Sequence, residues 1–267
     1  ITCRDWSSDV CSSDLVWITR YAMPSILVLN PQTNLAITEV PLDESLFTLS
    51  DTTLVDTDGS PESCGICVSA GKVYVAVQRI DNVSTYSPVG ESFVIVFNPS
   101  TRAMIDQISL PFTNPTSGPI IEPATGDVLV GCAGSWGAYN DGGIVKLNTS
   151  SDSVHSVVLT EEDAGGTLSA FAYFDSETAY VMTNAGWVDP YILKAFNPAT
   201  GNVAADPVYQ TTGYGAPVAV INDKLIVGDP AFGSEGLIFF DAETGDRIMD
   251  VVIPAGSYGP VQIIEIK

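Results

Sequence analysis

The strongest constraint on the fold is a phrase of two short apolar runs joined by a tight polar turn, which occurs five times. Each turn opens on Asn or Asp, and Gly201 and Gly245 each stand four residues after the opening residue of their turn. Asn and Asp bond their own backbone in turns, and Gly accepts the positive φ that closes them. The pattern predicts antiparallel hairpins. The phrases span residues 25–42, 92–111, 143–160, 191–209 and 236–254.

The spacing of these turns predicts the architecture. They open at Asn30, Asn98, Asn148, Asn197 and Asp241, which are 68, 50, 49 and 44 residues apart. A period near 45 with several strands per unit is typical of a β-propeller, whereas helical repeats would show 3.6-residue apolar spacing. We therefore predict an all-β fold, a β-propeller with four-stranded blades. The five visible repeats are expected to be part of a six- or seven-bladed propeller.

Each unit is expected to supply four strands, called A to D in chain order. The two runs of each phrase are strands C and D. Strand B precedes them at residues 16–21, 72–78, 127–134, 178–186 and 224–229. Strand A precedes the last four of these at residues 64–70, 119–124, 168–174 and 217–221. The strands are nearly continuous in apolar residues, as expected where both faces of a sheet are buried.

The two ends of the chain depart from the repeat. Residues 1–15 contain the near-duplication SSDV and SSDL, and CSSDL resembles a translated sequencing adapter. We interpret 1–15 as a non-native segment, the alternative being a natural polar tail, and 16–267 as the propeller domain. The first unit then lacks strand A. Residues 259–267 have the character of an A strand and could fill that gap.

The composition limits the partners and suggests a compartment. The formal net charge is −22, which repels phosphate backbones and anionic lipid surfaces, so nucleic-acid and membrane-surface roles are disfavoured. We expect no membrane span, because no apolar run approaches the roughly 18 residues that one requires. Low lysine content, with abundant Ser, Thr and Gly, favours a secreted, periplasmic or cell-surface protein. A monomer is expected.

The cysteines of the propeller domain are Cys64, Cys67 and Cys132. On a strand, a separation of three residues directs Cys64 and Cys67 to opposite faces. A structural zinc site needs four ligands, which the chain does not offer here. We interpret all three as small buried strand residues. The alternative is a disulfide between Cys132 and either Cys64 or Cys67.

The ends of the B strands are the candidate ligand site, because the B–C and D–A loops of a propeller emerge on one face around the central channel. Aromatic residues and Arg concentrate there, which is the composition of a binding surface. The alternative is that these side chains pack loop against loop and pair Arg with local carboxylates. The candidate ligand-binding residues are Arg20, Tyr21, Gln78, Arg79, Trp136, Tyr139, Asn184, Trp187, Asp229 and Phe232.

A candidate metal site lies in the long D–A insertion, residues 43–63. Its sequence DTDGSPE places Asp56, Asp58 and Glu62 around a glycine, resembling the start of a calcium loop. The pattern ends before the bidentate Glu that would complete such a loop. Calcium is therefore the one cofactor considered. The alternatives are a capped acidic turn or a carboxylate partner for Arg79.

Catalytic motifs are missing from the sequence. It contains no G-x-S-x-G, no phosphate-binding glycine loop and no metal triad. The only histidine, His155, falls in an expected outer strand. Asp and Glu are plentiful, so a pair of carboxylates could still serve a hydrolase. We therefore predict a non-enzymatic binding scaffold, with a propeller-type lyase or glycoside hydrolase as the alternative.

Several segments resemble the YVTN-type bacterial β-propellers, which include secreted and lipid-anchored proteins of unknown role. The resemblance covers residues 16–267 and rests on VWITRYAMPSILVLNPQT, KVYVAVQRID and TAYVMTNAG. DTDGSPE and GSWGAYNDGGI resemble a group within that family. The resemblance implies a seven-bladed fold with an export signal, and some related propellers capture small nutrients at the cell surface. It implies no catalytic residues. From the residues of the B–C and D–A loops we expect an unknown small ligand or a protein as the partner.

Overall fold

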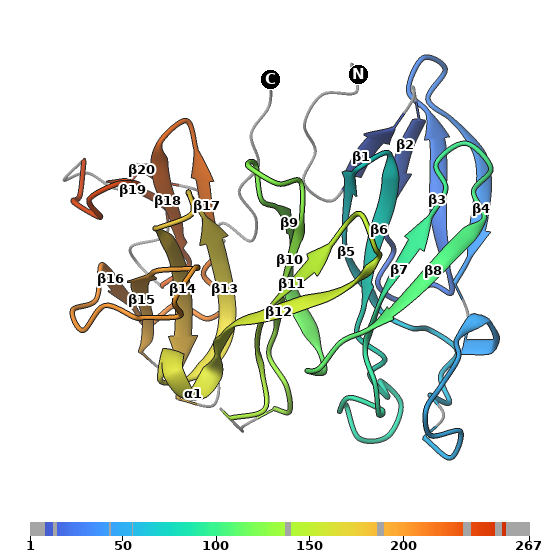
Figure 1. Cartoon of the computed structure of the whole chain (residues 1–267), viewed down its shortest axis with the longest axis horizontal. Coiled ribbons are helices and arrows are strands. Elements are labelled where there is room, and N and C mark those ends of the chain that lie inside the picture. Colours follow the sequence, from blue (N-terminus) through green and yellow to red (C-terminus); the bar gives the residue numbers. More distant parts are fainter. Residues whose placement is uncertain are drawn as a thin grey trace.

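A computed structural model describes residues 9–12, 15–42, 44–54, 56–136, 140–185, 190–231, 236–248 and 253–254. Its strands form five four-stranded antiparallel sheets, each built from strands consecutive in sequence (Figure 1). The first sheet contains β1 (Asp9–Ser12), β2 (Leu15–Ile18), β3 (Ser25–Asn30) and β4 (Leu35–Pro41). The second contains β5 (Ser63–Ser69), β6 (Lys72–Val77), β7 (Phe93–Phe97) and β8 (Met104–Ser109). The third contains β9 (Pro115–Ile121), β10 (Val128–Cys132), β11 (Gly143–Asn148) and β12 (Ser153–Thr160).

The last two sheets follow the same order. They are β13 (Thr167–Tyr173), β14 (Ala179–Asn184), β15 (Tyr191–Phe196) and β16 (Tyr209–Thr211), then β17 (Val218–Ile221), β18 (Lys224–Asp229), β19 (Gly236–Asp241) and β20 (Ile253–Pro254). Two short helices, η1 (Glu44–Leu46) and α1 (Glu161–Ala164), lie in D–A connections. The repeat predicted five units, four of them with all four strands, and the five sheets agree with that division.

The sheets are stacked side by side, and their first strands contact one another in the order β1, β5, β9, β13 and β17. The middle strand β6 shows how two neighbouring cores share one sheet. Its Val73, Val75 and Val77 pack toward the first sheet, whereas Tyr74 and Ala76 pack toward the third. Alternate side chains of a strand point to opposite faces, so a sheet between two others is apolar on both. This explains the nearly continuous apolar runs.

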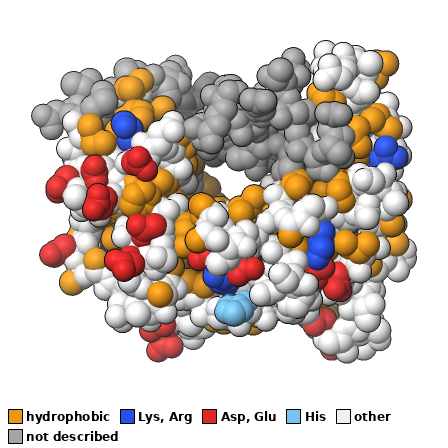
Figure 2. Space-filling view, turned by 45° about the horizontal axis from the view of Figure 1, so that its top comes forward, with side chains coloured by type: hydrophobic (Ala, Val, Ile, Leu, Met, Phe, Trp, Pro, Cys, Tyr) orange, Lys and Arg blue, Asp and Glu red, His pale blue; other side chains and the backbone are white. Residues whose placement is uncertain are grey.

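The outer strands have a different pattern, because their exposed faces reach solvent. In β8 and β12 most side chains are exposed or half-buried, whereas every residue of β7 and β10 is buried. Figure 2 shows acidic side chains scattered over the surface with few basic ones, and a central hollow between the sheets at the two ends of the series. No helix in the described part of the chain is long and apolar enough to span a membrane.

The first sheet contains a strand where none was expected. Residues 9–12, inside the segment interpreted as non-native, form β1 and pair with β2. They occupy the position that residues 259–267 were expected to fill. Those C-terminal residues lie outside the described part of the chain. The non-native origin of residues 1–15 stays a prediction.

The Asn and Asp residues that open the five C–D turns bond as their chemistry predicts. Asn98 Oδ1 accepts hydrogen bonds from the backbone N–H groups of Ser100 and Thr101, each at 2.9 Å. The same arrangement recurs at Asn148, Asn197 and Asp241. Gly201 and Gly245 both adopt a φ of 75°, the left-handed conformation that glycine takes without strain.

Replacing Asn98 with Ala is expected to lower the free energy of unfolding by about 1 kcal/mol, because two backbone N–H groups lose their acceptor. The matched control is Ser100→Ala in the same turn, expected to change stability by less than about 0.5 kcal/mol. Urea denaturation monitored by fluorescence measures both. Equal effects of the two substitutions would contradict the role assigned to the Asn98 side chain.

The three cysteines of the domain are free. Cys67 and Cys132 belong to the core between the second and third sheets, and Cys64 packs against it. The Cys64 Sγ lies 2.9 Å from the Pro115 carbonyl oxygen. Burial raises the pKa of the Cys64 and Cys67 thiols to about 12. The structure therefore agrees with small buried strand residues rather than a disulfide.

Candidate functional site

The B–C and D–A connections lie at the same end of the sheets, at the lower edge of Figure 1. The antiparallel order of four strands per sheet places both kinds of connection there. The largest of them, the insertion between β4 and β5, folds back onto the loop between β6 and β7. We call this end of the molecule the loop face.

Three aromatic side chains from successive B–C loops lie together on the loop face. Tyr21 follows β2, Tyr86 lies between β6 and β7, and Trp136 follows β10. The rings of Tyr86 and Trp136 are stacked, with centroids 6.0 Å apart and planes inclined by 14°. Burial and the neighbouring Tyr86 hydroxyl raise the pKa of Tyr21, so the Tyr21 and Tyr86 side chains lie close to each other. We call these three residues the aromatic row.

The aromatic row is accessible to a ligand. Tyr21 is 41% exposed and Tyr86 is 56% exposed, while Trp136 is half-buried. Large aromatic groups on a surface bury much apolar area when a partner covers them, and few bonds must be immobilised to do so. A row contributed by three sheets therefore offers a contact surface that the stacked sheets hold in place.

The loop that carries Tyr86 is held by its own hydrogen bonds. The Asp81 carboxylate accepts from the backbone N–H groups of Val83 and Ser84, at 3.1 and 2.9 Å, and from the Ser84 hydroxyl. The hydrogen bonds from Ser84 lower the pKa of Asp81 to about 2. The Tyr86 N–H donates to the Asp81 carbonyl oxygen at 2.7 Å. Tyr86 is thus presented by an ordered turn, with a φ of 51°.

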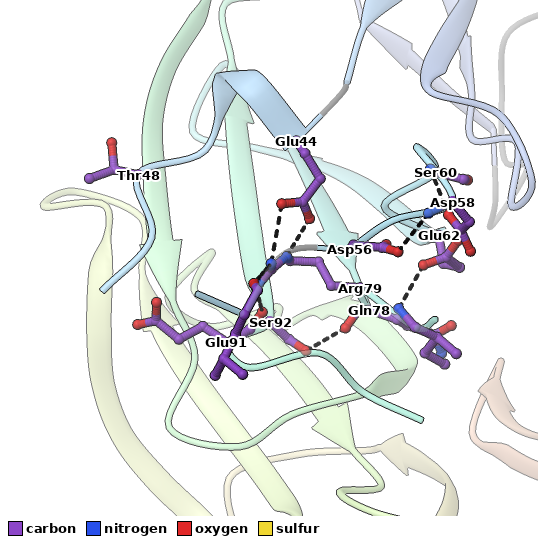
Figure 3. A network of polar contacts seen from close by, with 12 residues as sticks. Glu44, Thr48, Asp56, Asp58, Ser60, Glu62, Gln78, Arg79, Glu91 and Ser92 are labelled. Atoms are coloured by element: carbon purple, nitrogen blue, oxygen red, sulfur yellow. Dashed lines mark hydrogen bonds and ion pairs between the residues drawn. The ribbon is translucent and has the colours of Figure 1, made fainter. Parts of the chain in front are cut away.

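Arg79 lies inside the protein rather than on the loop face, with 1% of its surface exposed. Its Nε donates to Glu44 Oε1 at 2.6 Å, and its Nη2 donates to Glu44 Oε2 at 3.2 Å (Figure 3). The guanidinium also donates to the carbonyl oxygens of Glu91 and Leu54, each at 2.9 Å. The alternative considered for the turn 56–62 was that one of its carboxylates pairs with Arg79, but the observed partner is Glu44, which lies earlier in the insertion. Arg79 therefore fixes the insertion under the loop face.

Arg20 occupies the equivalent position in the first sheet but a different environment. Its Nη2 lies 2.8 Å from Glu39 Oε2 and also bonds the Ser25 hydroxyl. The side chains of Arg20 and Glu39 are 24% and 55% exposed. This is a partly solvated ion pair, so the Arg20 guanidinium remains close to the surface. Its role as a ligand contact stays a prediction.

Three further candidates are buried, and the side chains of two of them, Gln78 and Asp229, hold neighbouring segments in place. Gln78 donates through Nε2 to the Pro115 carbonyl oxygen at 2.9 Å, and Asn184 lies at the end of β14, paired across the sheet with Thr167. Asp229 accepts from the Tyr209 hydroxyl at 2.8 Å and from the Thr211 hydroxyl. Gln78 and Asn184 are therefore not surface contacts for a ligand, whereas Asp229 borders a recess. Tyr139, Trp187 and Phe232 lie outside the described residues, so their predicted roles stay predictions.

A polar recess of about 390 Å³ lies on the loop face of the fourth and fifth sheets. Asp229 forms part of its wall, together with Tyr209, Thr211 and Ala231. The backbone N–H of Ala231 donates to Asp229 Oδ1 at 2.9 Å. Both Asp229 carboxylate oxygens accept hydrogen bonds from residues that line the recess, so this carboxylate holds the lining residues in position.

The three predicted metal ligands, Asp56, Asp58 and Glu62, come together beside the aromatic row. One carboxylate oxygen of each lies within 4.8 Å of those of the others. Asp56 and Glu62 are buried, and Asp58 is half-buried. Burial is the main cause that raises the pKa of Asp56 to about 6 and that of Glu62 to about 8. The turn thus concentrates carboxylates where their charge is poorly hydrated.

Sequence reasoning missed Tyr86 and Glu44. Tyr86 lies eight residues after the end of the predicted B strand, in a polar loop without apolar periodicity. A search for aromatics in all five B–C loops would have found it. Glu44 is 35 residues from Arg79 in sequence, and no local pattern connects the two.

Comparisons with known proteins support the fold alone. No family model matches the sequence, and curated proteins give no match. Among solved structures, a chain from the crystal structure of a nidogen/laminin complex is 16% identical, with a TM-score of 0.56 over 95% of this chain and 81% of that one. Hydrazine synthase from Kuenenia stuttgartiensis is 14% identical, with a TM-score of 0.60 over 88% of this chain and 64% of that one. Together with the five antiparallel sheets, the similarity to these two structures shows an all-β, β-propeller-like fold.

Proposed function

We propose that this protein is a non-enzymatic binding scaffold that captures a protein partner on its loop face. The observation that carries the proposal is the aromatic row. Tyr21, Tyr86 and Trp136 come from three successive sheets, with Tyr86 stacked on Trp136 and close enough to Tyr21 to raise its pKa. Exposed aromatic clusters of this kind are the usual energetic centres of protein interfaces.

The charge of the chain supports a neutral or basic partner surface. The formal net charge is −22, and the acidic turn 56–62 contacts the Tyr21 backbone, because Ser60 donates to the Tyr21 carbonyl oxygen at 3.0 Å. Opposite charges steer association, whereas a phosphate-rich or acidic partner would be repelled. Aromatic rings also attract Arg and Lys side chains through cation–π contacts. The nidogen/laminin structure offers a fold precedent for a partner protein beside a propeller-like chain.

The proposal extends to family and compartment. The YVTN-type resemblance of the B and C strands and the low lysine content support an exported bacterial protein, secreted, periplasmic or lipid-anchored at the cell surface. It would act as a monomer there. Calcium is the one ion that its oxygen-rich insertion would suit.

The alternative of a lyase or glycoside hydrolase is less well supported by the same geometry. The converging carboxylates Asp56, Asp58 and Glu62 come close enough to act as a pair. However, Glu62 is 0% exposed and Asp56 is 4% exposed. A glycosidic bond has to contact both members of a catalytic pair, and only Asp58 is partly accessible. The buried cluster therefore favours a structural or ion-binding role.

The proposal is tested by selecting binders from a displayed random peptide library on the intact protein, followed by affinity measurement on variants. Tyr86→Ala and Trp136→Ala are each expected to weaken the selected peptides by about 30-fold, corresponding to about 2 kcal/mol. Thermal stability should change little, because Tyr86 is exposed and Trp136 is half-buried.

Tyr214→Ala is the matched control. Tyr214 is a 68% exposed tyrosine in the D–A loop between β16 and β17, on the same face but outside the aromatic row. Its substitution should leave peptide affinity unchanged. The proposal fails if the selected peptides bind the Tyr86 and Trp136 variants as tightly as the unaltered protein, or if Tyr214→Ala is equally damaging.

A further inference from the structure

We infer that Asp56, Asp58 and Glu62 form a calcium-binding site, independent of what the loop face captures. All three come from the seven-residue turn 56–62, and Gly59 takes a φ of 79° within it. The turn brings one carboxylate oxygen of each residue within 4.8 Å of those of the other two. Three carboxylates this close repel one another, unless a cation lies between them.

A buried carboxylate oxygen without a donor marks the position of the ion. Asp56 is 4% exposed, and its Oδ2 has no hydrogen-bond partner among the described residues. In Figure 3 its side chain points toward Asp58 and Glu62. A buried, unpartnered carboxylate oxygen is costly, and a cation bound by the three carboxylates would remove that cost.

The basic side chains that the structure describes do not supply a positive charge to balance these three carboxylates. None of the ion pairs in the described part of the chain includes Asp56, Asp58 or Glu62. The guanidinium of Arg79 is directed at Glu44 and at two backbone carbonyl oxygens. A cation that balances the ionised turn therefore has to come from solution.

The two other carboxylates are held in position by neighbouring donors. Asp58 accepts from the backbone N–H groups of Ser60 at 2.8 Å and Asn82 at 2.9 Å. Glu62 accepts from the Ile80 N–H at 2.7 Å and from Asn82 Nδ2 at 2.8 Å. Each carboxylate oxygen keeps a second lone pair for a metal ion. Donors of this kind orient ligands around a metal centre.

The ligand chemistry selects calcium. All three ligands are oxygens, with no His or Cys in the cluster, which disfavours zinc and copper. Calcium takes about 6–8 oxygens in flexible geometry, and three carboxylates bound through one or both oxygens supply about 3–6 of them. The half-buried side of Asp58 leaves room for water to complete the shell. Magnesium requires a stricter octahedral arrangement and gives up its water reluctantly.

The test is calcium titration of the intact protein by isothermal titration calorimetry, together with thermal unfolding in EDTA and in about 5 mM CaCl₂. We expect one calcium ion per chain with a Kd of roughly 10⁻⁴–10⁻³ M or tighter. The midpoint of unfolding should rise with calcium concentration, because only the folded turn assembles the ligands. An equal concentration of MgCl₂ should raise it less.

Asp56→Asn removes one ligand charge at nearly constant shape, and it should weaken calcium binding at least tenfold. Asp106→Asn, in the outer strand β8 and exposed, is the matched control and should bind as the unaltered protein does. Terbium luminescence excited through nearby tyrosine gives a second readout on the unaltered protein, and calcium should quench it by displacement. If Asp56→Asn does not fold, this displacement decides the outcome.

Two results would overturn the inference. The first is an absence of calcium binding and of terbium displacement at about 5 mM calcium. The second is equal calcium stabilisation in Asp56→Asn and Asp106→Asn, which would show only the general attraction of cations to an acidic chain.

Discussion

Replacing Arg79 with Met is expected to lower the free energy of unfolding by about 3–5 kcal/mol, the largest effect of any single side chain considered. Met keeps the apolar packing against Phe93, whose ring lies 5.8 Å from the Arg79 Cζ. The substitution leaves the Glu44 carboxylate and the carbonyl oxygens of Glu91 and Leu54 without their donor. Urea denaturation at neutral pH measures the loss.

Arg20→Met is the matched control, because Arg20 stands at the equivalent end of a B strand. Its pair with Glu39 is partly exposed, and such pairs contribute about 1 kcal/mol or less. We expect the two variants to differ in the free energy of unfolding because the Arg79 ion pair is buried and the Arg20 ion pair is partly exposed. If both substitutions have the same effect on stability, the insertion is not held by Arg79 as the structure indicates.

Replacing Gly65 with Ala is expected to lower the free energy of unfolding by about 3 kcal/mol, because two inner strands are in direct contact there. A Cβ on Gly65, in β5, would lie 2.7 Å from Pro119 Cδ in β9 and still closer to the Gly118 carbonyl oxygen. These contacts involve backbone and a rigid ring, so the neighbouring strand has to move. Thermal and urea unfolding both report this displacement.

Gly71→Ala separates crowding from backbone strain. Gly71 has a φ of 73°, but a Cβ there would meet no atom within 4 Å. Its substitution should cost only the strain of a left-handed alanine, about 1 kcal/mol. A Gly65→Ala variant as stable as Gly71→Ala would show that β5 and β9 do not approach closely, and the side-by-side stacking of the sheets would be contradicted.

Arg79 also connects stability to the candidate site. Its guanidinium holds the insertion that carries Asp56, Asp58 and Glu62, and Ser60 of that insertion donates to the Tyr21 carbonyl oxygen at 3.0 Å. The same insertion therefore contacts the aromatic row. Loss of Arg79 is expected to weaken both calcium binding and partner capture, whereas loss of Tyr86 should weaken partner capture alone.

The strand order and the turns could be predicted from the sequence because their signals are local. An Asn side chain bonds N–H groups two and three residues ahead, as Asn98 does. Alternation along β6 depends only on the geometry of an extended chain. The gathering of Asp56, Asp58 and Glu62 was also predictable, because all three lie in one short turn.

The exposure of the predicted site residues was not predictable in this way. Arg20 and Arg79 end equivalent strands, and the sequence alone made both of them ligand contacts. Arg79 is buried because an insertion 35 residues away supplies Glu44 and covers it. Gln78 and Asp229 are likewise buried by loops whose path no local pattern specifies.

The amino-acid sequence alone determined five repeat units, each with its turn and four of them with all four strands, since a turn or an alternating strand needs only residues close together in the chain. The tertiary structure decided which loop residues share a surface. Tyr21, Tyr86 and Trp136 meet because three sheets stack in order and place their B–C loops side by side. That proximity depends on packing between units, which lies beyond the range of any local sequence signal.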